Sequence, residues 1–288
     1  FGCLHGNATN CRSAIVRRAI DSVLAQDFAD FELIVVDDAS SDGTADIVAA
    51  IEDPRLRLLR QPGCLGGNAA RNRGIRETAA PLIALLDSDD EYLPAKLATV
   101  VEAFDRQPDL GALLDSYAIA FPDRHGGKPQ PRINPATEAS DDFLAALFGS
   151  SAYPRRLRVS ASGISLRRDV AIRAGLFDET IRRRQDFEFL ARVAKAARCA
   201  SSDRQLWIKH ETGDSITAIG PGYMAATIAI CRRHPEYLED RRLRGALSRD
   251  IVRHLYRALR AGRWAAFRED FAMLRAEFGL PRLLRLIG

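Results

Sequence analysis

Two runs of apolar residues, each followed by a cluster of aspartates, constrain the fold of this chain more than any other feature. The first run covers residues 31–36 and precedes an Asp-Asp pair at 37–38, and the second covers residues 82–86 and precedes Asp-Ser-Asp-Asp at 87–90. Runs of this length that are rich in Val, Ile and Leu and lack polar alternation predict strands buried on both faces. Because stretches with helical periodicity separate these strands, the sequence predicts an α/β fold with a mostly parallel sheet flanked by helices.

The order of these elements predicts that both aspartate clusters face one crevice. In open parallel sheets, ligands bind outside the carboxyl ends of the strands, and both clusters lie at such ends. Carboxylates crowded into one crevice repel each other unless a cation holds them together. The sequence therefore predicts a divalent metal and a phosphorylated ligand at this edge of the sheet.

Asp87 and Asp89 are the candidate metal ligands of the second cluster. Alternate residues that leave a strand point to the same side, and hard cations prefer carboxylate and phosphate oxygens. Such a metal would neutralise a diphosphate leaving group. The alternative is a capped turn, since Asp-Ser-Asp-Asp ahead of a helix is also favourable turn chemistry. Three acids in four residues directly after a buried strand favour the metal site.

Asp38 has a different expected role. An acid at the tip of an early strand in a nucleotide-binding half accepts hydrogen bonds from ribose or base. The alternative is capping of the following turn, and because Asp37 is adjacent, we expect one residue for each task. The glycine-rich loop within residues 63–74 opens a helix, so its amides could approach phosphates. Arg71 and Arg73 either assist with diphosphate charge or lie on the helix surface, and the sequence leaves both interpretations open.

Weaker patterns predict the remaining elements. Helical spacing and capping residues predict helices over 15–26, 42–51, 69–78, 94–106, 141–148 and 168–174, one from 186 onward, and helix throughout the region after 222. Short strands are predicted at 56–59 and 162–166 and in LWIKH at 206–210. The stretch 121–135 is rich in Pro, Gly and charge, which predicts a loop or a boundary between half-domains.

Composition is that of an ordinary globular protein, with 47% hydrophobic and 28% charged residues. No apolar run approaches the ~18 residues needed to cross a bilayer, so we expect no transmembrane helix. The first residues lack a charged region followed by an apolar stretch, so we expect no signal peptide. The five cysteines are scattered without C-x-x-C spacing, which argues against a zinc site or a disulfide framework. We therefore expect a cytoplasmic protein.

The end of the chain is strongly basic. From Arg241 onward it contains 12 Arg, 4 acidic residues and no Lys, in a helical apolar pattern. A basic amphipathic tail can lie on an anionic membrane surface or contact nucleic acid. The alternative is a solvated helical face that covers the main domain, which the interspersed core formers favour. We expect no nucleic-acid partner, and peripheral contact with the inner face of the membrane stays the second interpretation.

Three segments together resemble the family 2 glycosyltransferases of the GT-A fold. They are AIDSVLAQDFADFELIVVDDASSDGT, ARNRGI and LIALLDSDDEYLP, and the similarity runs from about residue 9 to residue 210. The DDxSxDGT and DSDD elements, in this order and spacing, are the specific part of the resemblance. It implies a nucleotide diphosphate-sugar donor, with a UDP-sugar expected, a Mn²⁺ or Mg²⁺ ion, and sugar transfer with inversion at the anomeric carbon.

The resemblance also implies roles for single residues. Asp38 matches the acid that contacts the nucleobase, and Asp87 and Asp89 match the DxD element, whose last acid binds the metal. Residues 8–11 match a turn that cradles the nucleotide, and the residues before this turn have no strand character, so the family's first strand is expected to be missing or altered. The expected nucleotide-sugar-binding residues are Thr9, Asp38, Arg71, Asp87, Ser88 and Asp89. The expected metal ligands are Asp89, Asp87 and His210.

His210 is the weakest member of this set. It lies at the end of the predicted strand LWIKH, where the resemblance implies that it could reach the metal or the diphosphate. A lone histidine at a strand end is more often packed or hydrogen-bonded, and this alternative stays open.

Inverting transfer also needs a general base that takes the proton from the attacking acceptor hydroxyl. The family has an E-D pair that opens a helix on the acceptor side, and Gln185-Asp186 occupies this place here. Asp186 is therefore the predicted base. The alternative is that Asp186 only complements the amino terminus of the helix. The three arginines at 182–184 are expected to depress its pKa, or to attract an anionic acceptor or the donor phosphates.

Together these features predict an inverting glycosyltransferase that acts on a glycan or lipid-linked acceptor in bacterial surface polysaccharide assembly. The expected organisation is a nucleotide-sugar-binding half (1–115), an acceptor-binding half (116–221) and a basic helical tail (222–288). Two alternatives are a sugar-nucleotide nucleotidyltransferase and a nucleotide-sugar-binding protein without turnover. The first usually has a basic, glycine-rich amino-terminal loop, which FGCLHGNATN does not provide.

Overall fold

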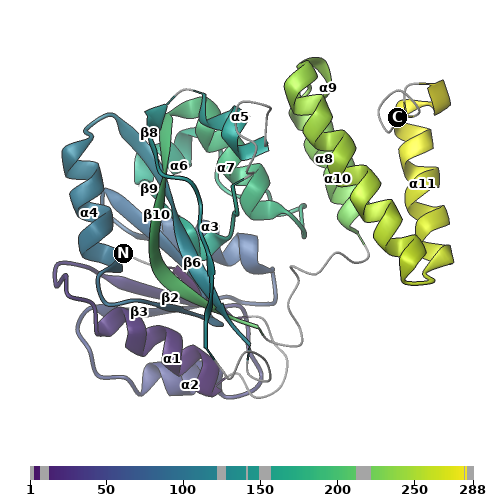
Figure 1. Cartoon of the computed structure of the whole chain (residues 1–288). Coiled ribbons are helices and arrows are strands. Elements are labelled where there is room, and N and C mark those ends of the chain that lie inside the picture. Colours follow the sequence, from purple (N-terminus) through teal and green to yellow (C-terminus); the bar gives the residue numbers. More distant parts are fainter. Residues whose placement is uncertain are drawn as a thin grey trace.

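A mixed sheet of ten strands forms the centre of the part of the chain that the structure describes (Figure 1). The computed structural model describes residues 3–6, 13–121, 128–140, 142–148, 157–211, 222–281 and 283. The strands are β1 (Cys3–Gly6), β2 (Leu33–Asp37), β3 (Leu56–Arg60), β4 (Leu82–Asp87), β5 (Asp90–Tyr92), β6 (Leu110–Ala120), β7 (Gln130–Arg132), β8 (Thr137–Ser140), β9 (Ile164–Arg167) and β10 (Arg198–His210). The helices are α1 (Ser13–Leu24), α2 (Thr44–Ala49), α3 (Gly67–Glu77), α4 (Lys96–Arg106), α5 (Phe143–Phe148), α6 (Arg168–Arg173), α7 (Gln185–Ala196), α8 (Tyr223–Arg233), α9 (Glu236–Glu239), α10 (Arg241–Arg260) and α11 (Trp264–Phe278).

The sheet is parallel in one half and mixed in the other. Its main path runs β3-β2-β1-β4-β9-β6-β10-β5, with β7 beside β6 and β8 beside β10. Neighbours among β1 to β4 pair in parallel, and so do β6 and β10. β9 lies antiparallel between β4 and β6, and β5 is antiparallel to β10. The predicted α/β fold is confirmed, and the predicted parallel arrangement holds for the half that carries both aspartate clusters.

The apolar run before the second aspartate cluster is buried on both faces, as predicted. In β4, Ile83 and Leu85 belong to the hydrophobic cluster on one face of the sheet. Ala84 and Leu86 belong to the cluster on the opposite face. Because successive side chains of a strand point to opposite faces, such a strand needs a helical layer on each side.

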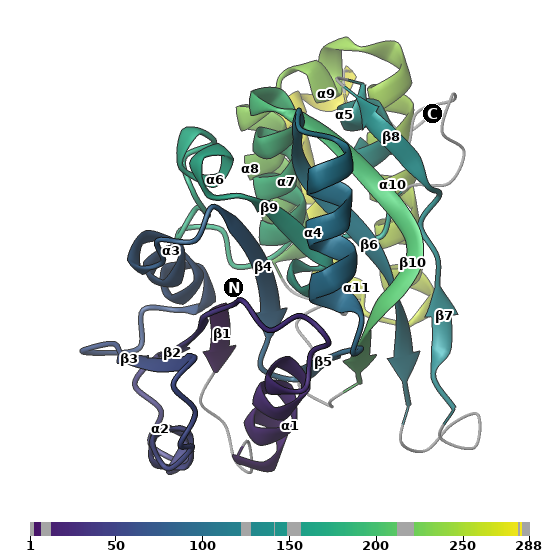
Figure 2. The ribbon, with the colours of Figure 1, turned by 90° about the vertical axis from the view of Figure 1, so that its left-hand side faces the viewer.

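Helices supply these two layers (Figure 2). Ile20 of α1 and Val100 of α4 pack on one face, with Val48 of α2 in the same cluster. Ile75 of α3 and Leu190 of α7 pack on the other face, together with α5 and α6. Burying each such Val, Ile or Leu side chain stabilises the fold by about 1.5–3 kcal/mol. The apolar residues at helical spacing in the sequence are therefore the ones that pack the helices onto the two faces of the sheet.

The described residues after 222 are mostly helical, as predicted, and α8 to α11 form a layer outside α5 and α7 (Figure 1). The inner side chains of this layer, such as Met224, Leu247 and Leu274, belong to the same hydrophobic cluster as α7. The tail therefore covers the main domain, which is the interpretation that the sequence favoured. None of the helices in the described residues combines the length and the apolar character that crossing a membrane requires.

The prediction that the first strand is missing or altered is wrong for residues 3–6. They form β1, whose backbone pairs in parallel with residues 34–37 on one side and with residues 85–87 on the other. Backbone hydrogen bonds to β2 on one side and β4 on the other stabilise this strand, although its residues have a weak intrinsic preference for strand structure. The turn expected around Thr9 lies outside the described residues.

The centre of the chain contains a long strand that the sequence patterns did not reveal. β6 runs from Leu110 to Ala120, and it is buried although it contains Asp115 and Ser116. Asp115 forms an ion pair with Lys96 of α4, and neither side chain has any exposed surface. Part of the loop predicted at 121–135 is β7, paired with β6. The proposed division between residues 115 and 116 falls inside β6, so the three-part organisation stays a prediction.

Candidate active site

Both aspartate clusters lie at one edge of the sheet, as the sequence predicts. In the parallel registers, Asp37 of β2 is level with Gly6 of β1, and Asp87 of β4 is level with His5. The carboxyl ends of β2 and β4 therefore flank β1 on the same side. This edge of the sheet carries the candidate site.

Asp87, Asp89 and Asp90 form an acidic cluster in which one carboxylate oxygen from each residue lies within 4.8 Å of the others. Asp90 has no exposed surface, and its Oδ1 atom accepts no hydrogen bond from any residue that the structure describes. A buried acceptor without a donor favours an additional cationic partner. Three carboxylate oxygens at this spacing fit the ligand preference of Mn²⁺ or Mg²⁺.

The electrostatics of Asp90 reflect this crowding. Burial raises its pKa well above the usual value, the positive charge of Lys209 opposes this rise, and the neighbouring Asp89 and Asp87 add to it. A divalent ion at the cluster would reverse this balance, because it stabilises the ionised carboxylates. Lys209 and Arg71 offset part of the negative charge of the acidic cluster, and a divalent cation would offset more of it.

Lys209 and Asp90 belong to the site and are not among the residues that the sequence predicts to bind ligand or metal. Lys209 on β10 is level with Asp90 on β5 in the antiparallel pair. Its burial opposes the charged form, but the charges of Asp90, Asp87 and Asp89 raise its pKa above the ordinary value. In the sequence, the one indication that Lys209 has a role is that its charge interrupts an apolar strand, two positions after Trp207.

A serine hydroxyl links the acidic cluster to the start of β9. Ser162 Oγ donates a hydrogen bond of 2.5 Å to Asp90 Oδ2 and accepts one of 3.0 Å from the backbone N–H of Asp87. The next residue, Gly163, approaches β6 and β10 so closely that a Cβ atom would lie 3.2 Å from Trp207 Nε1. This close packing sets the position of Ser162 and, through it, of Asp90.

Arg71 lies inside the site, so the interpretation of Arg71 as a surface residue is wrong. Only 5% of the residue is exposed, and its Nη2 atom lies 2.6 Å from Asp87 Oδ1. Its guanidinium also lies over the ring of Phe177, 5.4 Å from the ring centroid. By contrast, Arg73 donates to the carbonyl oxygen of Arg60 at the end of β3, and no recorded contact links it to the acidic cluster.

Asp38 anchors the glycine-rich loop that precedes α3. Its two carboxylate oxygens accept hydrogen bonds from Gln61 Nε2 at 2.7 Å, Leu65 N at 2.7 Å and Gly66 N at 2.8 Å. The neighbouring Asp37 accepts a hydrogen bond of 3.3 Å from Ser40 N, which is the predicted turn capping. The contact of Asp38 with a nucleobase stays a prediction.

Asp186 opens α7 close to the acidic cluster. Its Oδ1 atom is buried and has no hydrogen-bond partner among the described residues. Burial raises its pKa, the charge of Arg71 lowers it, and the charge of Asp87 raises it further, with a net rise. The charges of Arg71 and Asp87, which are both far from Asp186 in the sequence, therefore act on its carboxylate. The role of Asp186 as the general base stays a prediction.

The prediction that residues 182–184 depress the pKa of Asp186 is wrong, because that pKa is raised. Arg184 is directed away from the acidic cluster: it donates to Thr227 Oγ1 at 2.9 Å and lies 3.5 Å from Asp250. Its charge therefore serves the contact between α7 and the tail helices, and Arg71 is the arginine that acts on Asp186.

His210 is hydrogen-bonded, as its alternative interpretation predicts. Its Nε2 atom lies 2.9 Å from Glu91 Oε2, and burial lowers its pKa, with Glu91 partly offsetting this effect. The nearby Arg18 donates to the carbonyl oxygen of Asp89 at 2.9 Å. A metal contact of His210 stays a prediction. Ser88, between the two acids, is buried.

A mixed α/β sheet with an Asp-x-Asp sequence at the carboxyl end of β4 defines a GT-A-type domain, and solved structures share this fold. The crystal structure of S. aureus TarS 1–349 in complex with UDP-GlcNAc matches with a TM-score of 0.65 and 15% identity, over 96% of this chain and 91% of that one. A mannosyltransferase from Pyrobaculum calidifontis, in complex with GDP-Man and Mn²⁺, matches with a TM-score of 0.52 and 19% identity, over 99% of this chain and 77% of that one.

Residues 8–158, more than half of the chain, match the family model of glycosyl transferase family 2, and the chain belongs to this family. The succinoglycan biosynthesis protein ExoO of Rhizobium meliloti is 46% identical over 98 residues, which cover 34% of this chain and 28% of that protein. ExoU of the same organism is 29% identical over 270 residues, 83% of this chain and 75% of that protein. An Escherichia coli glucosyltransferase, WfaP, is 32% identical over 35% of this chain and 39% of its own length.

Proposed function

We propose that this chain is an inverting, metal-dependent glycosyltransferase that moves a sugar from a nucleotide diphosphate-sugar to an acceptor hydroxyl in bacterial polysaccharide assembly. The observation that carries the proposal is the convergence of Asp186 with Arg71 and Asp87 beside the acidic cluster. This arrangement puts a candidate base next to a candidate diphosphate site, as one-step displacement at a sugar carbon requires.

In the proposed site, Asp89, Asp87 and Asp90 hold a Mn²⁺ or Mg²⁺ ion. The ion would supply Lewis-acid stabilisation of the departing diphosphate. Lys209, whose ammonium is largely buried beside the three carboxylates, keeps the charge of the acidic cluster balanced. Arg71 adds a second positive charge at Asp87 and orients that carboxylate through a charge-assisted hydrogen bond.

Asp186 acts as the general base in this proposal. The raised pKa brings the basicity of its carboxylate closer to neutral pH, which makes proton transfer from an acceptor hydroxyl more favourable. Its Oδ1 atom has no partner among the described residues, so it can accept the hydrogen bond of an incoming hydroxyl.

The donor is proposed to be a UDP-sugar, bound by Thr9, Asp38, Arg71, Asp87, Ser88 and Asp89. TarS, with the same fold, binds UDP and UDP-GlcNAc, and the name of WfaP specifies UDP-Glc. Asp38 and the loop that it anchors lie at the end of β2, where the nucleobase would lie. His210 is proposed to approach the metal or the diphosphate from the end of β10.

The acceptor is proposed to be a glycan or a lipid-linked glycan, reached at the inner face of the membrane. The name of WfaP specifies a diphosphoundecaprenol-linked acceptor. One side of α10, the following turn and the first residue of α11 carry a set of exposed side chains that we call the basic stripe. Its members are Arg249, Val252, Arg253, Tyr256, Arg257, Arg260, Arg263 and Trp264.

The chemistry of the basic stripe fits an anionic lipid surface. Tyr256 is 56% exposed and Trp264 58% exposed, and aromatic residues of this kind anchor proteins at the boundary between lipid and water. The one acid of α10, Asp250, is buried. The described side chains of α10 therefore present positive charge and apolar surface to the outside.

Turnover of UDP-, GDP- and dTDP-sugars in the presence of Mn²⁺ tests the proposed function. Metal-dependent release of nucleoside diphosphate, which increases when a GlcNAc-diphosphoprenyl acceptor is added, supports it. Exchange of pyrophosphate into the nucleotide sugar would instead indicate a nucleotidyltransferase. Binding without turnover of any of the three donor classes, with and without acceptor, would indicate a nucleotide-sugar-binding protein.

A further inference from the structure

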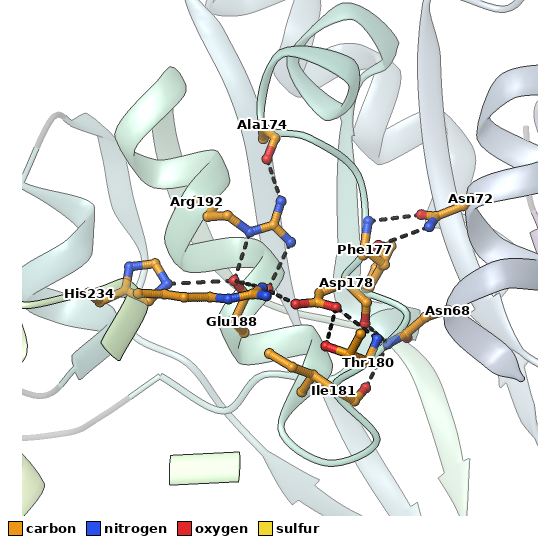
Figure 3. Close-up of polar contacts among 11 residues, drawn as sticks. Asn68, Asn72, Ala174, Phe177, Asp178, Thr180, Ile181, Glu188, Arg192 and His234 are labelled. Atoms are coloured by element: carbon orange, nitrogen blue, oxygen red, sulfur yellow. Dashed lines mark hydrogen bonds and ion pairs between the residues drawn. The ribbon is translucent and has the colours of Figure 1, made fainter. Parts of the chain in front are cut away.

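The segment that leads to Asp186 is held by an asparagine of α3 (Figure 3). We call residues 177–186 the base segment. Asn72 Nδ2 donates to the carbonyl oxygen of Phe177 at 2.9 Å, and Asn72 Oδ1 accepts from the N–H of Phe177 at 2.8 Å. The same amide nitrogen donates to Glu179 Oε1 at 2.8 Å. Asn72 is 2% exposed, so its amide pairs with the base segment much as a strand backbone would.

A second asparagine extends this contact along the base segment. Asn68 Nδ2 donates to the carbonyl oxygens of Asp178 at 2.7 Å and Ile181 at 2.8 Å. Its Oδ1 atom accepts from Arg71 Nη1 at 3.2 Å. Residues at i, i+3 and i+4 of a helix share one face, so Asn68, Arg71 and Asn72 project from α3 together. One face of α3 therefore contacts Asp87 through Arg71, and it contacts the base segment through the two asparagines.

The far side of the base segment is fixed by α8 of the tail. Asp178 forms an ion pair with Arg233 at the end of α8. Arg184, next to the start of α7, has a left-handed φ of 56° and is held by Thr227 of α8. A residue other than glycine keeps this strained conformation only where its surroundings enforce it. The base segment is thus pinned at both ends, directly before Asp186.

We propose that Asn72, supported by Asn68, is a positioning residue: it locks the base segment to α3 so that Asp186 stays in register with Arg71 and Asp87. This inference rests on the proposed function, in which Asp186 is the general base. Loss of the Asn72 contacts would leave the acidic cluster intact, because the hydrogen bonds of the Asn72 side chain go to Phe177 and Glu179 and not to the three aspartates. It would instead free Phe177 and the residues that follow to move away from α3.

The predicted effect is a selective loss of turnover. A misplacement of a catalytic group by about 1 Å can lower a rate about 100-fold. Asn72→Ala is therefore expected to lower kcat by about 10–100-fold while the Kd for the nucleoside diphosphate with Mn²⁺ changes by less than about twofold, the pattern of a lost transition-state interaction. The kcat is measured with the nucleotide sugar that the wild type turns over fastest, and the Kd is measured with the nucleoside diphosphate of that donor.

Gln26→Ala is the matched control. Gln26 is also a buried bridging amide, 8% exposed, that donates to the carbonyl oxygens of Ser22 and Leu93 and accepts from Leu97 N. It joins α1 to the start of α4, away from the base segment. If Gln26→Ala lowers Tm as much as Asn72→Ala and also lowers kcat as much, Asn72 is merely structural and the inference is overturned. A parallel loss of diphosphate affinity in Asn72→Ala overturns it as well.

Hydrogen exchange tests the inference apart from the proposed function. In Asn72→Ala, or in the milder Asn72→Ser where the alanine variant folds poorly, the amide of Phe177 is expected to exchange faster while the amides of β4 keep their wild-type rates. Unchanged exchange at Phe177 refutes the lock. Absence of turnover in the wild type refutes the proposed function, and with it the effect on catalysis, whereas the exchange data still decide whether Asn72 holds the segment.

Discussion

Replacing Asp186 by asparagine removes the proposed base with the smallest possible change of shape. Asparagine keeps the size of the side chain and lacks the negative charge. Because Oδ1 of Asp186 accepts no hydrogen bond from the described residues, the substitution breaks no contact there. Arg71 keeps its ion pair with Asp87 at 2.6 Å, so we expect the donor side of the site to stay intact.

The expected loss follows from the role of the carboxylate. General-base catalysis typically contributes about 10²–10⁴-fold to a rate. Burial raises the pKa of Asp186 above the usual value, so its carboxylate is a stronger base than an exposed one. We therefore expect kcat to fall about 10³-fold, which is about 4 kcal/mol of activation free energy. The Kd for UDP with Mn²⁺ should change by less than about twofold, since the removed interaction forms only with the acceptor.

Single-turnover transfer and calorimetric binding of UDP measure the two quantities, and the pH profile gives a third. Only the ionised carboxylate accepts a proton, so wild-type turnover should rise with pH through the pKa of Asp186, which lies above the usual value. This acidic limb should be absent from the residual activity of Asp186→Asn. Turnover within about threefold of the wild type would refute Asp186 as the base.

Asp169→Asn is the matched control for the alternative that Asp186 only complements a helix amino terminus. Asp169 is the second residue of α6, as Asp186 is the second residue of α7, but Asp169 is exposed and pairs with Arg173. Its loss is expected to lower stability by about 0.3–1 kcal/mol and to leave kcat unchanged. An equal loss of kcat in both variants would favour the helix-terminus explanation for Asp186.

Asp89→Ala is expected to abolish the Mn²⁺-dependent part of UDP binding, because its carboxylate is one of the three that cluster within 4.8 Å; equal affinities of variant and wild type in Mn²⁺ titrations would contradict the metal role. Lys96→Ala should lower the free energy of unfolding in urea by about 3–5 kcal/mol, since it leaves the fully buried Asp115 without its ion pair; a loss below about 1 kcal/mol would show that the pair is solvated. Reversing the charge of Arg253 and Arg257 should release the protein from anionic liposomes but not alter binding to neutral ones, and unaltered sedimentation with anionic vesicles would contradict membrane contact through the basic stripe.

Much of the candidate site could be predicted from local patterns. The run before Asp87 predicted a strand buried on both faces, and the structure has that strand with opposite faces in two hydrophobic clusters. Buried strands and amphipathic helices leave a signal in consecutive residues, because the period of the chain sets which side chains face the core. Asp87 was found for this reason, at the end of a strand, whereas Asp186 was found through the resemblance to family 2 glycosyltransferases.

Other features depend on partners far away in the sequence, and local patterns did not contain them. β1 is a strand because β2 and β4 offer hydrogen bonds on both sides, and β6 tolerates Asp115 because Lys96 neutralises it. The three arginines at 182–184 are neighbours of Asp186 in the sequence and therefore suggested a lowered pKa. Burial and the charge of Asp87, which the fold brings close, raise it instead.

Local sequence patterns thus determined most of the helices, the buried strands β2 and β4, and the acids that end these two strands, because hydrophobic periodicity is visible in neighbouring positions. Only the tertiary structure decided that Lys209 lies beside the acidic cluster, that Arg71 is buried against Asp87, and that α3 holds the segment before Asp186. Charge, desolvation and hydrogen bonding act through space, so these properties depend on which residues the fold brings together.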